Sequence, residues 1–404
     1  MPFHRRLACK LNYFQSIILM FAAVILIGAA LLMLPISAQE RTVTPFHEAL
    51  FTATSAVCVT GLVVEDTYLF WSPFGQAVIL CLIQTGGLGV ITVAVSFAIL
   101  SGRKISLMQR STMQDAISAP KIGGIVRLTK FSVQGTLFIE LLGMTAMLPV
   151  FFRDYGIKGI WMAAFHSVSA FCNAGFDLMG RYEPYSSLTG YYNDYVVNIT
   201  IMALILIGGL GFTVWADLKH NKLYFKKYTL HTKIVVVSSI VLVVVPTILF
   251  MYFERDGVEA GMPFADRFIT SLFAAVTPRT AGYNTVDLGA MTQASKLLTI
   301  ILMFIGGCPG STAGGVKTTS IVIIMVYIWS NLRNASGCNI YGRRLADEDI
   351  KKASMVIGLN LIMAVAALLI ISGMQSFDFE DLCLEVFSAV GTVGLSTGIT
   401  RQLN

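Results

Sequence analysis

The segment that decides the fold reads TPRTAGYN and runs from Thr277 to Asn284. Three other segments align without gaps on its glycine: VTGL at 59–62, NAGF at 173–176 and TVGL at 392–395. The four glycines, at positions 61, 175, 282 and 394, are 114, 107 and 112 residues apart. Self-similarity at a nearly fixed spacing indicates internal repeats, so the chain is predicted to contain one structural unit four times.

The composition places these units in a membrane. The chain has 404 residues, of which 55% are hydrophobic and only 13% are charged, and its mean hydropathy is +0.72. Soluble domains carry roughly a quarter of charged residues. A chain this apolar cannot cover its surface with polar groups in water, so we predict a multi-pass membrane protein.

The apolar segments fall into two length classes. Stretches long enough to span a bilayer lie at 14–34, 74–100, 125–152, 195–218, 234–253, 297–329 (interrupted) and 353–373. Shorter apolar segments, at 46–57, 161–171, 264–276 and 379–389, each precede one of the four glycines. Roughly 20 residues are needed to cross, so the shorter segments are predicted to be re-entrant pore helices.

The repeat unit is therefore a span, a pore helix, a glycine loop and a second span. The units are predicted at 11–101, 123–219, 231–332 and 351–404, and the fourth has no second span within this chain. Two spans per unit give every copy the same orientation, with symmetry about the membrane normal. The predicted fold is an all-α integral membrane protein with four parallel repeats around a pseudo-four-fold central pore.

The basic residues predict the orientation of the chain. Of its 29 Lys and Arg residues, 19 lie within 5–10, 103–130, 219–233 and 333–352, whereas the other connecting segments are acidic. Basic segments are cytoplasmic by the positive-inside rule, which places the N-terminus in the cytoplasm. Because apolar spans separate the basic clusters, a nucleic-acid-binding surface is excluded.

The glycine loops are predicted to form an ion selectivity filter. Dehydrating an ion is costly, and rings of backbone carbonyls can replace its water in potassium-channel filters of the TVGYG type. Directing successive carbonyls at one axis requires positive φ, which glycine adopts easily. A turn is the alternative for any single loop, but four loops in register favour a filter that binds K⁺ through its carbonyls. The predicted filter residues are Val59, Thr60, Gly61, Asn173, Ala174, Gly175, Thr280, Ala281, Gly282, Thr392, Val393 and Gly394.

A glycine-rich break interrupts the sixth span at 306–319. Proline and several glycines cannot continue a helix, and non-helical backbone at membrane depth must face protein or a water-filled cavity. A phosphate-binding loop is disfavoured because Val316 precedes Lys317 where that motif needs glycine. A passive kink and a gate below the filter remain, and we favour the gate. Its predicted residues are Gly306, Gly307, Pro309, Gly310, Gly314, Gly315 and Lys317.

The role of Lys317 in this loop stays open. It could hold the loop through a carboxylate, hold it through carbonyls, or repel a cation. Related glycine clusters at 86–89 and 208–211 are interpreted as close helix packing.

The four glycine loops and the break at 306–319 resemble the superfamily of Trk, Ktr and HKT potassium transporters, over most of the chain. The lack of extra N-terminal spans is most similar to the KtrB family, the membrane subunits of bacterial Ktr systems. The resemblance implies potassium uptake at the bacterial plasma membrane, stimulated by sodium, and an intramembrane gate loop. It also implies a homodimer on a cytosolic ring of nucleotide-binding RCK subunits, and a fourth repeat that continues through one more span.

Two of the four loops depart from the potassium pattern, which leaves a sodium-permeable or non-selective transporter as the alternative. An intramembrane enzyme is disfavoured, because no paired intramembrane acids and no Ser–His pair stand out. The seven cysteines show no metal-binding spacing, so no cofactor is expected in this chain.

Overall fold

The computed structural model describes residues 13–90, 92–93, 124–181, 183–222, 224–335 and 337–402. This part of the chain is helical apart from loops and one hairpin, in which β1 (Asn339–Ile340) pairs antiparallel with β2 (Arg343–Arg344). The basic cluster at 5–10 and most of the one at 103–130 lie outside the described residues.

The helices follow one another in four groups. The first contains α2 (Tyr13–Leu32), η1 (Pro35–Ser37), α3 (Phe46–Val57) and α4 (Pro73–Leu88). The second contains α7 (Ile125–Tyr155), α8 (Lys158–Phe171), η2 (Thr189–Tyr191), α9 (Tyr195–Leu210) and α10 (Phe212–Asn221). The third contains η3 (Phe225–Lys227), α11 (Leu230–Phe253), α12 (Phe264–Val276), α13 (Gln293–Phe304) and α14 (Thr318–Leu332). The fourth contains α15 (Asp347–Met374), α16 (Phe379–Gly391) and η4 (Ile399–Gln402).

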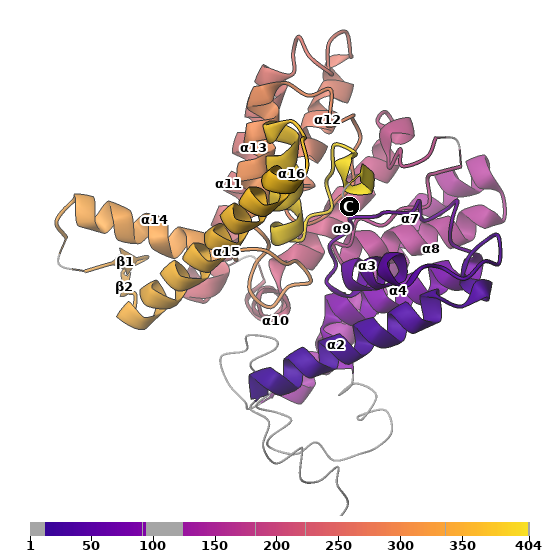
Figure 1. The fold of residues 1–404 in the computed structure, drawn as a ribbon. Coiled ribbons are helices and arrows are strands. Elements are labelled where there is room, and N and C mark those ends of the chain that lie inside the picture. The colour runs from indigo at the N-terminus through magenta and orange to yellow at the C-terminus, as the bar shows by residue number, and fades with distance from the viewer. Residues whose placement is uncertain are drawn as a thin grey trace, which may run out of the picture.

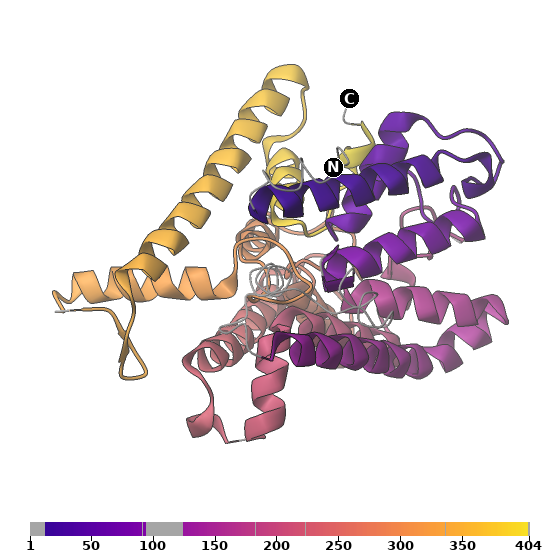
Figure 2. The same cartoon turned by 90° about the horizontal axis from the view of Figure 1, so that it is seen from below.

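Each group pairs a long helix with a short one. The long helices α2, α7, α11 and α15 pack against α3, α8, α12 and α16, respectively. Neighbouring groups meet through the pairs α4–α8, α9–α12 and α13–α16. The loops at the C-terminal ends of these short helices contact one another. Figures 1 and 2 show that α14 and α15 project from one side of the molecule.

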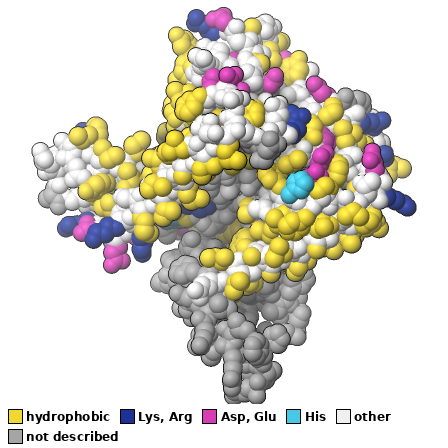
Figure 3. Space-filling model, viewed as in Figure 1, with side chains coloured by type: hydrophobic (Ala, Val, Ile, Leu, Met, Phe, Trp, Pro, Cys, Tyr) yellow, Lys and Arg dark blue, Asp and Glu magenta, His cyan; other side chains and the backbone are white. Residues whose placement is uncertain are grey.

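Within the described residues, four helices are long and apolar enough to cross a membrane: Gln15–Leu32, α7, α11 and α15. The bent pair α9 and α10 provides a fifth candidate span. Large apolar side chains remain exposed on these helices, including Ile18, Ile248 and Ile362, at 67%, 62% and 69%. Figure 3 shows such side chains over much of the visible surface, as expected where lipid is the solvent.

One predicted span is not straight. The chain was expected to cross at 195–218 in one helix, but α9 and α10 meet at 94°. Gly211 lies between them with φ of +95°, and Gly89 ends α4 with φ of +83°. These are the last glycines of the two glycine clusters. Positive φ is incompatible with a right-handed helix, so the last glycine of each cluster ends its helix.

The paired glycines of the same clusters do pack closely. A methyl group built on Gly86 would lie 2.0 Å from the carbonyl oxygen of Val57, at the end of α3. One built on Gly208 would lie 2.0 Å from that of Phe171, at the end of α8. A side chain at either position would push α4 or α9 away from the pore helix that it supports.

Candidate functional site

All four glycine loops begin where a short helix ends. Their glycines, Gly61, Gly175, Gly282 and Gly394, have φ angles of +87°, +69°, +79° and +92°. L-residues reach this left-handed region only at a cost of roughly 1–2 kcal/mol. The conformation expected from the sequence is present in every loop.

A second left-handed residue precedes each glycine by two positions. Val59, Asn173, Thr280 and Thr392 have φ angles of +57°, +59°, +67° and +52°. Three of these are β-branched, for which positive φ is a genuine outlier. Strained backbone of this kind persists where the surrounding structure enforces it, and it clusters at functional sites. Only the glycines were expected to have this conformation, because β-branched side chains give no sequence signal for it.

The four loops close on one another in a ring. A methyl group built on Gly61 would lie 2.4 Å from the carbonyl oxygen of Ala174, and one on Gly175 would lie 2.7 Å from that of Ala281. One on Gly282 would lie 2.7 Å from the carbonyl oxygen of Val393. The ring closes because a methyl group on Gly394 would lie 2.4 Å from the carbonyl oxygen of Thr60. Each loop therefore touches the next, in chain order, through the carbonyl that precedes the next glycine.

Hydroxyl groups fix each loop to its short helix. Ser55 Oγ donates to the carbonyl of Leu62 at 2.7 Å, and Ser169 Oγ to that of Phe176 at 2.7 Å. In the fourth loop, Ser388 Oγ accepts a hydrogen bond from the amide of Gly394 at 3.1 Å. These three serines stand six residues before their glycines.

The third loop keeps this anchor with a different spacing. Val276 occupies the position six residues before its glycine, but Thr277 Oγ1 donates to the carbonyl of Tyr283. The anchor thus stands one residue closer to Gly282. The gap-free alignment missed Thr277, although a hydroxyl within one residue of the expected position was visible in the sequence.

The glycine-rich break lies against the fourth loop. It runs between α13, which ends at Phe304, and α14, which begins at Thr318. A methyl group built on Gly314 would lie 1.9 Å from Thr392 Oγ1. The break and the fourth loop are therefore in direct contact.

Backbone hydrogen bonds join the break to the bend between α9 and α10. The amide of Phe212 donates to the carbonyl of Gly310 at 2.9 Å, and the amide of Cys308 donates to the carbonyl of Gly209 at 3.1 Å. Thr312 Oγ1 donates to the carbonyl of Phe171, at the end of α8, at 3.1 Å. The glycine cluster at 208–211 thus supports the break as well as packing against a short helix.

Lys317 bonds to backbone carbonyls of the break itself. Its Nζ donates to the carbonyl of Ala313 at 2.6 Å and to that of Gly314 at 3.5 Å. No carboxylate pairs with it among the described residues. Of the three roles left open by the sequence, holding the loop through carbonyls is the one that these contacts support.

Two cavities, called here the outer and the inner cavity, adjoin the glycine loops. The outer one, of about 180 Å³, is lined by all four glycines and by residues that follow them, including Asp66, Asp177 and Arg401. The inner one, of about 240 Å³, is lined by Val59 and by residues 310–314 of the break. The first loop thus lines the outer cavity with residues from Gly61 onward and the inner one with residues up to Val59, and the break forms a wall of the inner one.

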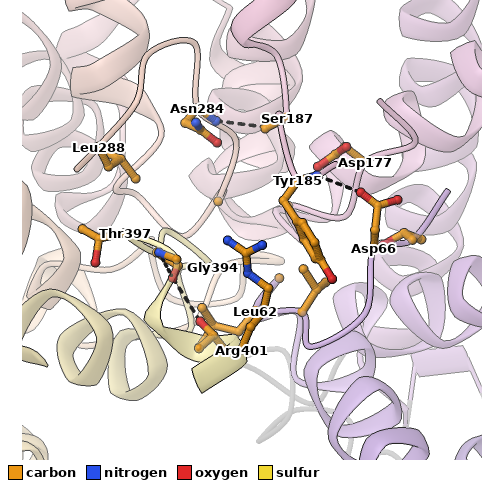
Figure 4. A pocket seen from close by; sticks show the side chains of 18 of the residues that line it. Leu62, Asp66, Asp177, Tyr185, Ser187, Asn284, Leu288, Gly394, Thr397 and Arg401 are labelled. Carbon is orange, nitrogen blue, oxygen red and sulfur yellow. Dashed lines mark hydrogen bonds between the residues drawn. The ribbon is translucent and has the colours of Figure 1, made fainter. Parts of the chain in front are cut away.

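The outer cavity is lined by acidic groups (Figure 4). Asp66 Oδ1 accepts the amides of Tyr68 and Leu69, and its Oδ2 accepts the amide of Tyr185. Asp177 accepts the amide of Met179 at 2.9 Å, and burial raises the pKa of Asp177 to about 7. Asp287 also lines this cavity. From the sequence these carboxylates were expected only as part of the acidic connecting segments, since only the folded loops bring them to one cavity.

The comparisons with known proteins agree on one family. Residues 9–404 match the family model described as "TrkH: Cation transport protein". The chain is 37% identical over 406 residues to the potassium/sodium uptake protein NtpJ of Enterococcus hirae, covering 99% of this chain and 88% of that protein. It is 37% identical over 392 residues to the Ktr system potassium uptake protein B of Bacillus subtilis, covering 96% and 86%.

A solved structure has the same fold. The crystal structure of the potassium transporter TrkH from Vibrio parahaemolyticus superposes with a TM-score of 0.74, at 19% identity, and the match covers 96% of this chain and 78% of that one. The predicted all-α membrane fold is confirmed by this likeness.

Proposed function

Because the chain belongs to the TrkH family of cation transport proteins, we propose that it takes up potassium ions across the plasma membrane through a single-file pore lined by the four glycine loops. One observation supports the proposal most directly: four strained loops close into one ring, and all four of their glycines line one cavity. Alternating positive-φ positions direct backbone carbonyls toward a common axis, and such rings replace the hydration shell of K⁺.

The chain is a multi-pass membrane protein, and its orientation follows from its charges. By the positive-inside rule we assign the basic segments at 219–233 and 333–352, and the N-terminus, to the cytoplasmic side. The outer cavity with its aspartates then faces outward, where it can attract cations before they reach the ring.

The break at 306–319 is proposed to gate this pore from the inner side. It contacts the fourth loop at Thr392 and forms a wall of the inner cavity. Glycine accepts both signs of φ, so the break can change conformation at low torsional cost. A cytosolic partner can favour one of its conformations only by binding the two states with different affinity.

We propose that this subunit works as a homodimer on a cytosolic ring of nucleotide-binding RCK subunits. The support is the similarity to a protein named as a component of a Ktr system. The purified subunit should elute as a dimer and capture a nucleotide-binding protein from native membranes. Nucleotide-responsive flux through the purified subunit alone would contradict a separate regulatory ring.

A sodium-permeable or non-selective transporter is the second candidate. It is favoured by a 37% identical relative named for both potassium and sodium uptake. The first two loops also lack the potassium-type sequence. Sodium could act as a transported ion or as an activating ion.

Ion uptake decides between these candidates. Rubidium uptake should be measured in cells that lack their own potassium uptake, and in liposomes that contain the purified protein. Potassium transport predicts that K⁺ competes with rubidium far better than Na⁺ does, with or without stimulation by Na⁺. Equal competition by both ions would establish the non-selective alternative, and absence of uptake in both systems would contradict the proposal.

A further inference from the structure

The outer cavity of this cation pathway contains one basic side chain among its described lining residues, Arg401. Its guanidinium carbon lies 4.0 Å from the centroid of the Tyr185 ring. Figure 4 shows the two side chains facing each other at the cavity. A cation at the entrance of a cation pore is unfavourable for the entering ion, so its placement calls for a function.

The backbone that carries Arg401 is fixed by the fourth repeat. Arg401 belongs to η4, which follows the fourth glycine loop. The preceding residue, Thr400, is buried, and its Oγ1 hydrogen-bonds both to Glu385 on α16 and to Ser396 Oγ. The backbone of Arg401 is therefore held at a fixed distance from the ring of glycine loops.

Tyr185 is held from the other side of the cavity. Its amide donates to Asp66 Oδ2 at 2.9 Å, and its hydroxyl donates to the carbonyl of Val64 at 3.1 Å. Its φ of +60° places it in the left-handed region. The aromatic ring of Tyr185 is thus tied to the first repeat. A guanidinium stacked on that aromatic ring by a cation–π interaction stays at the mouth of the pore.

Within the described part of the chain, Arg401 forms no ion pair, since no carboxylate there lies within ion-pair distance of its guanidinium. Asp66, the carboxylate that Tyr185 contacts, already accepts three backbone amides. Arg401 therefore adds a positive potential to a cavity that is otherwise lined by aspartates, and it opposes their attraction for an entering ion.

We propose that Arg401, stacked on Tyr185, is an affinity-determining cation at the outer mouth, which raises the external K⁺ concentration needed for half-maximal uptake. The inference rests on the proposed function, because it requires ions to enter through this cavity. Arg401 acts through its charge and does not coordinate the ion.

A series of charges at position 401 tests this in the full chain reconstituted in liposomes. The KM for rubidium uptake should be unchanged in Arg401→Lys, about five-fold lower in Arg401→Gln and lower still in Arg401→Glu, as expected for a Coulomb interaction. The differences should shrink when N-methylglucamine chloride raises the ionic strength, because salt screens exposed charges. Tyr185→Leu should also lower the KM, since the guanidinium is then free to leave the mouth.

Arg255→Gln is the matched control. Arg255 also stacks on a tyrosine, Tyr252, at 5.2 Å, but it pairs with Asp256 and does not line the outer cavity. Its KM should equal that of the unmodified protein. A purely structural role for Arg401 would raise the KM in the Gln and Glu variants alike, and that result, or a flat series, would overturn the inference. Failure of the unmodified protein to take up rubidium would instead contradict the proposed function.

Discussion

Replacing Gly282 by alanine tests the ring of loops most directly. The new methyl group would lie 2.7 Å from the carbonyl oxygen of Val393 and 3.1 Å from the Cα of Gly175. Both are backbone atoms of neighbouring loops, so neither can move aside as a flexible side chain could. Relief to an ordinary contact requires the Val393 carbonyl to move by at least about 0.7 Å, and such overpacking costs about 1–3 kcal/mol.

The backbone of Gly282 adds a second cost. Its φ of +79° is unfavourable for alanine by about 1–2 kcal/mol. The total of roughly 2–5 kcal/mol is large against the usual stability of a protein. If about half of it is expressed as weaker ion coordination, the KM for potassium rises by roughly 5- to 60-fold. Discrimination against sodium falls as well, since the carbonyl of the neighbouring loop is displaced.

The assay is rubidium uptake into liposomes, with increasing K⁺ or Na⁺ as competitor, by protein that elutes as a single folded species. Gly261→Ala is the control, because Gly261 has a similar φ of +78° with nothing within 4 Å of an added methyl group. It isolates the backbone cost and should leave the KM unchanged. If Gly282→Ala folds and keeps the normal KM and ion preference, the assignment of the ring as a filter is wrong. The Gly175→Ser variant repeats the test in the second loop.

Three further predictions concern the mouth, the gate and the anchors. Burial raises the pKa of Asp177 to about 7, so its carboxyl group becomes charged as the external pH rises from 6 to 8. The KM for rubidium should then fall about five-fold. Asp177→Asn should remove this dependence of the KM on pH. Gly314→Ala forces the break away from Thr392, as shortening 307–314 does, and should raise basal ion flux at least about three-fold. The control is Gly358→Ala, because an added methyl group there meets open space. Equal flux through the two variants would contradict the gate. Thr277→Val leaves the carbonyl of Tyr283 without its hydroxyl donor, which costs about 1–3 kcal/mol. The melting temperature in a thermal-shift assay should therefore fall, and an unchanged melting temperature would contradict the anchor.

The sequence by itself determined the class of the protein and its repeated unit. Hydropathy and length predict seven spans, because about 20 apolar residues are needed to cross a bilayer, and four of them, or five with the bent pair, are helices of that length in the described part of the chain. The four aligned glycines identified the loops, and each glycine has the positive φ that its role requires. The break at 306–319 was also visible, because proline and glycine interrupt helices through local backbone effects. These features depend on nearby residues alone.

Only the tertiary structure decided how the loops meet and what surrounds them. The left-handed conformations of Val59, Thr280 and Thr392 have no sequence signal, because the packing around each loop imposes them against local preference. The bend at Gly211 and the anchor from Thr277 depend on the elements packed beside them. Likewise, Asp177 and Arg401 lie 224 residues apart in the chain, and they line one cavity only because the four repeats close into a ring.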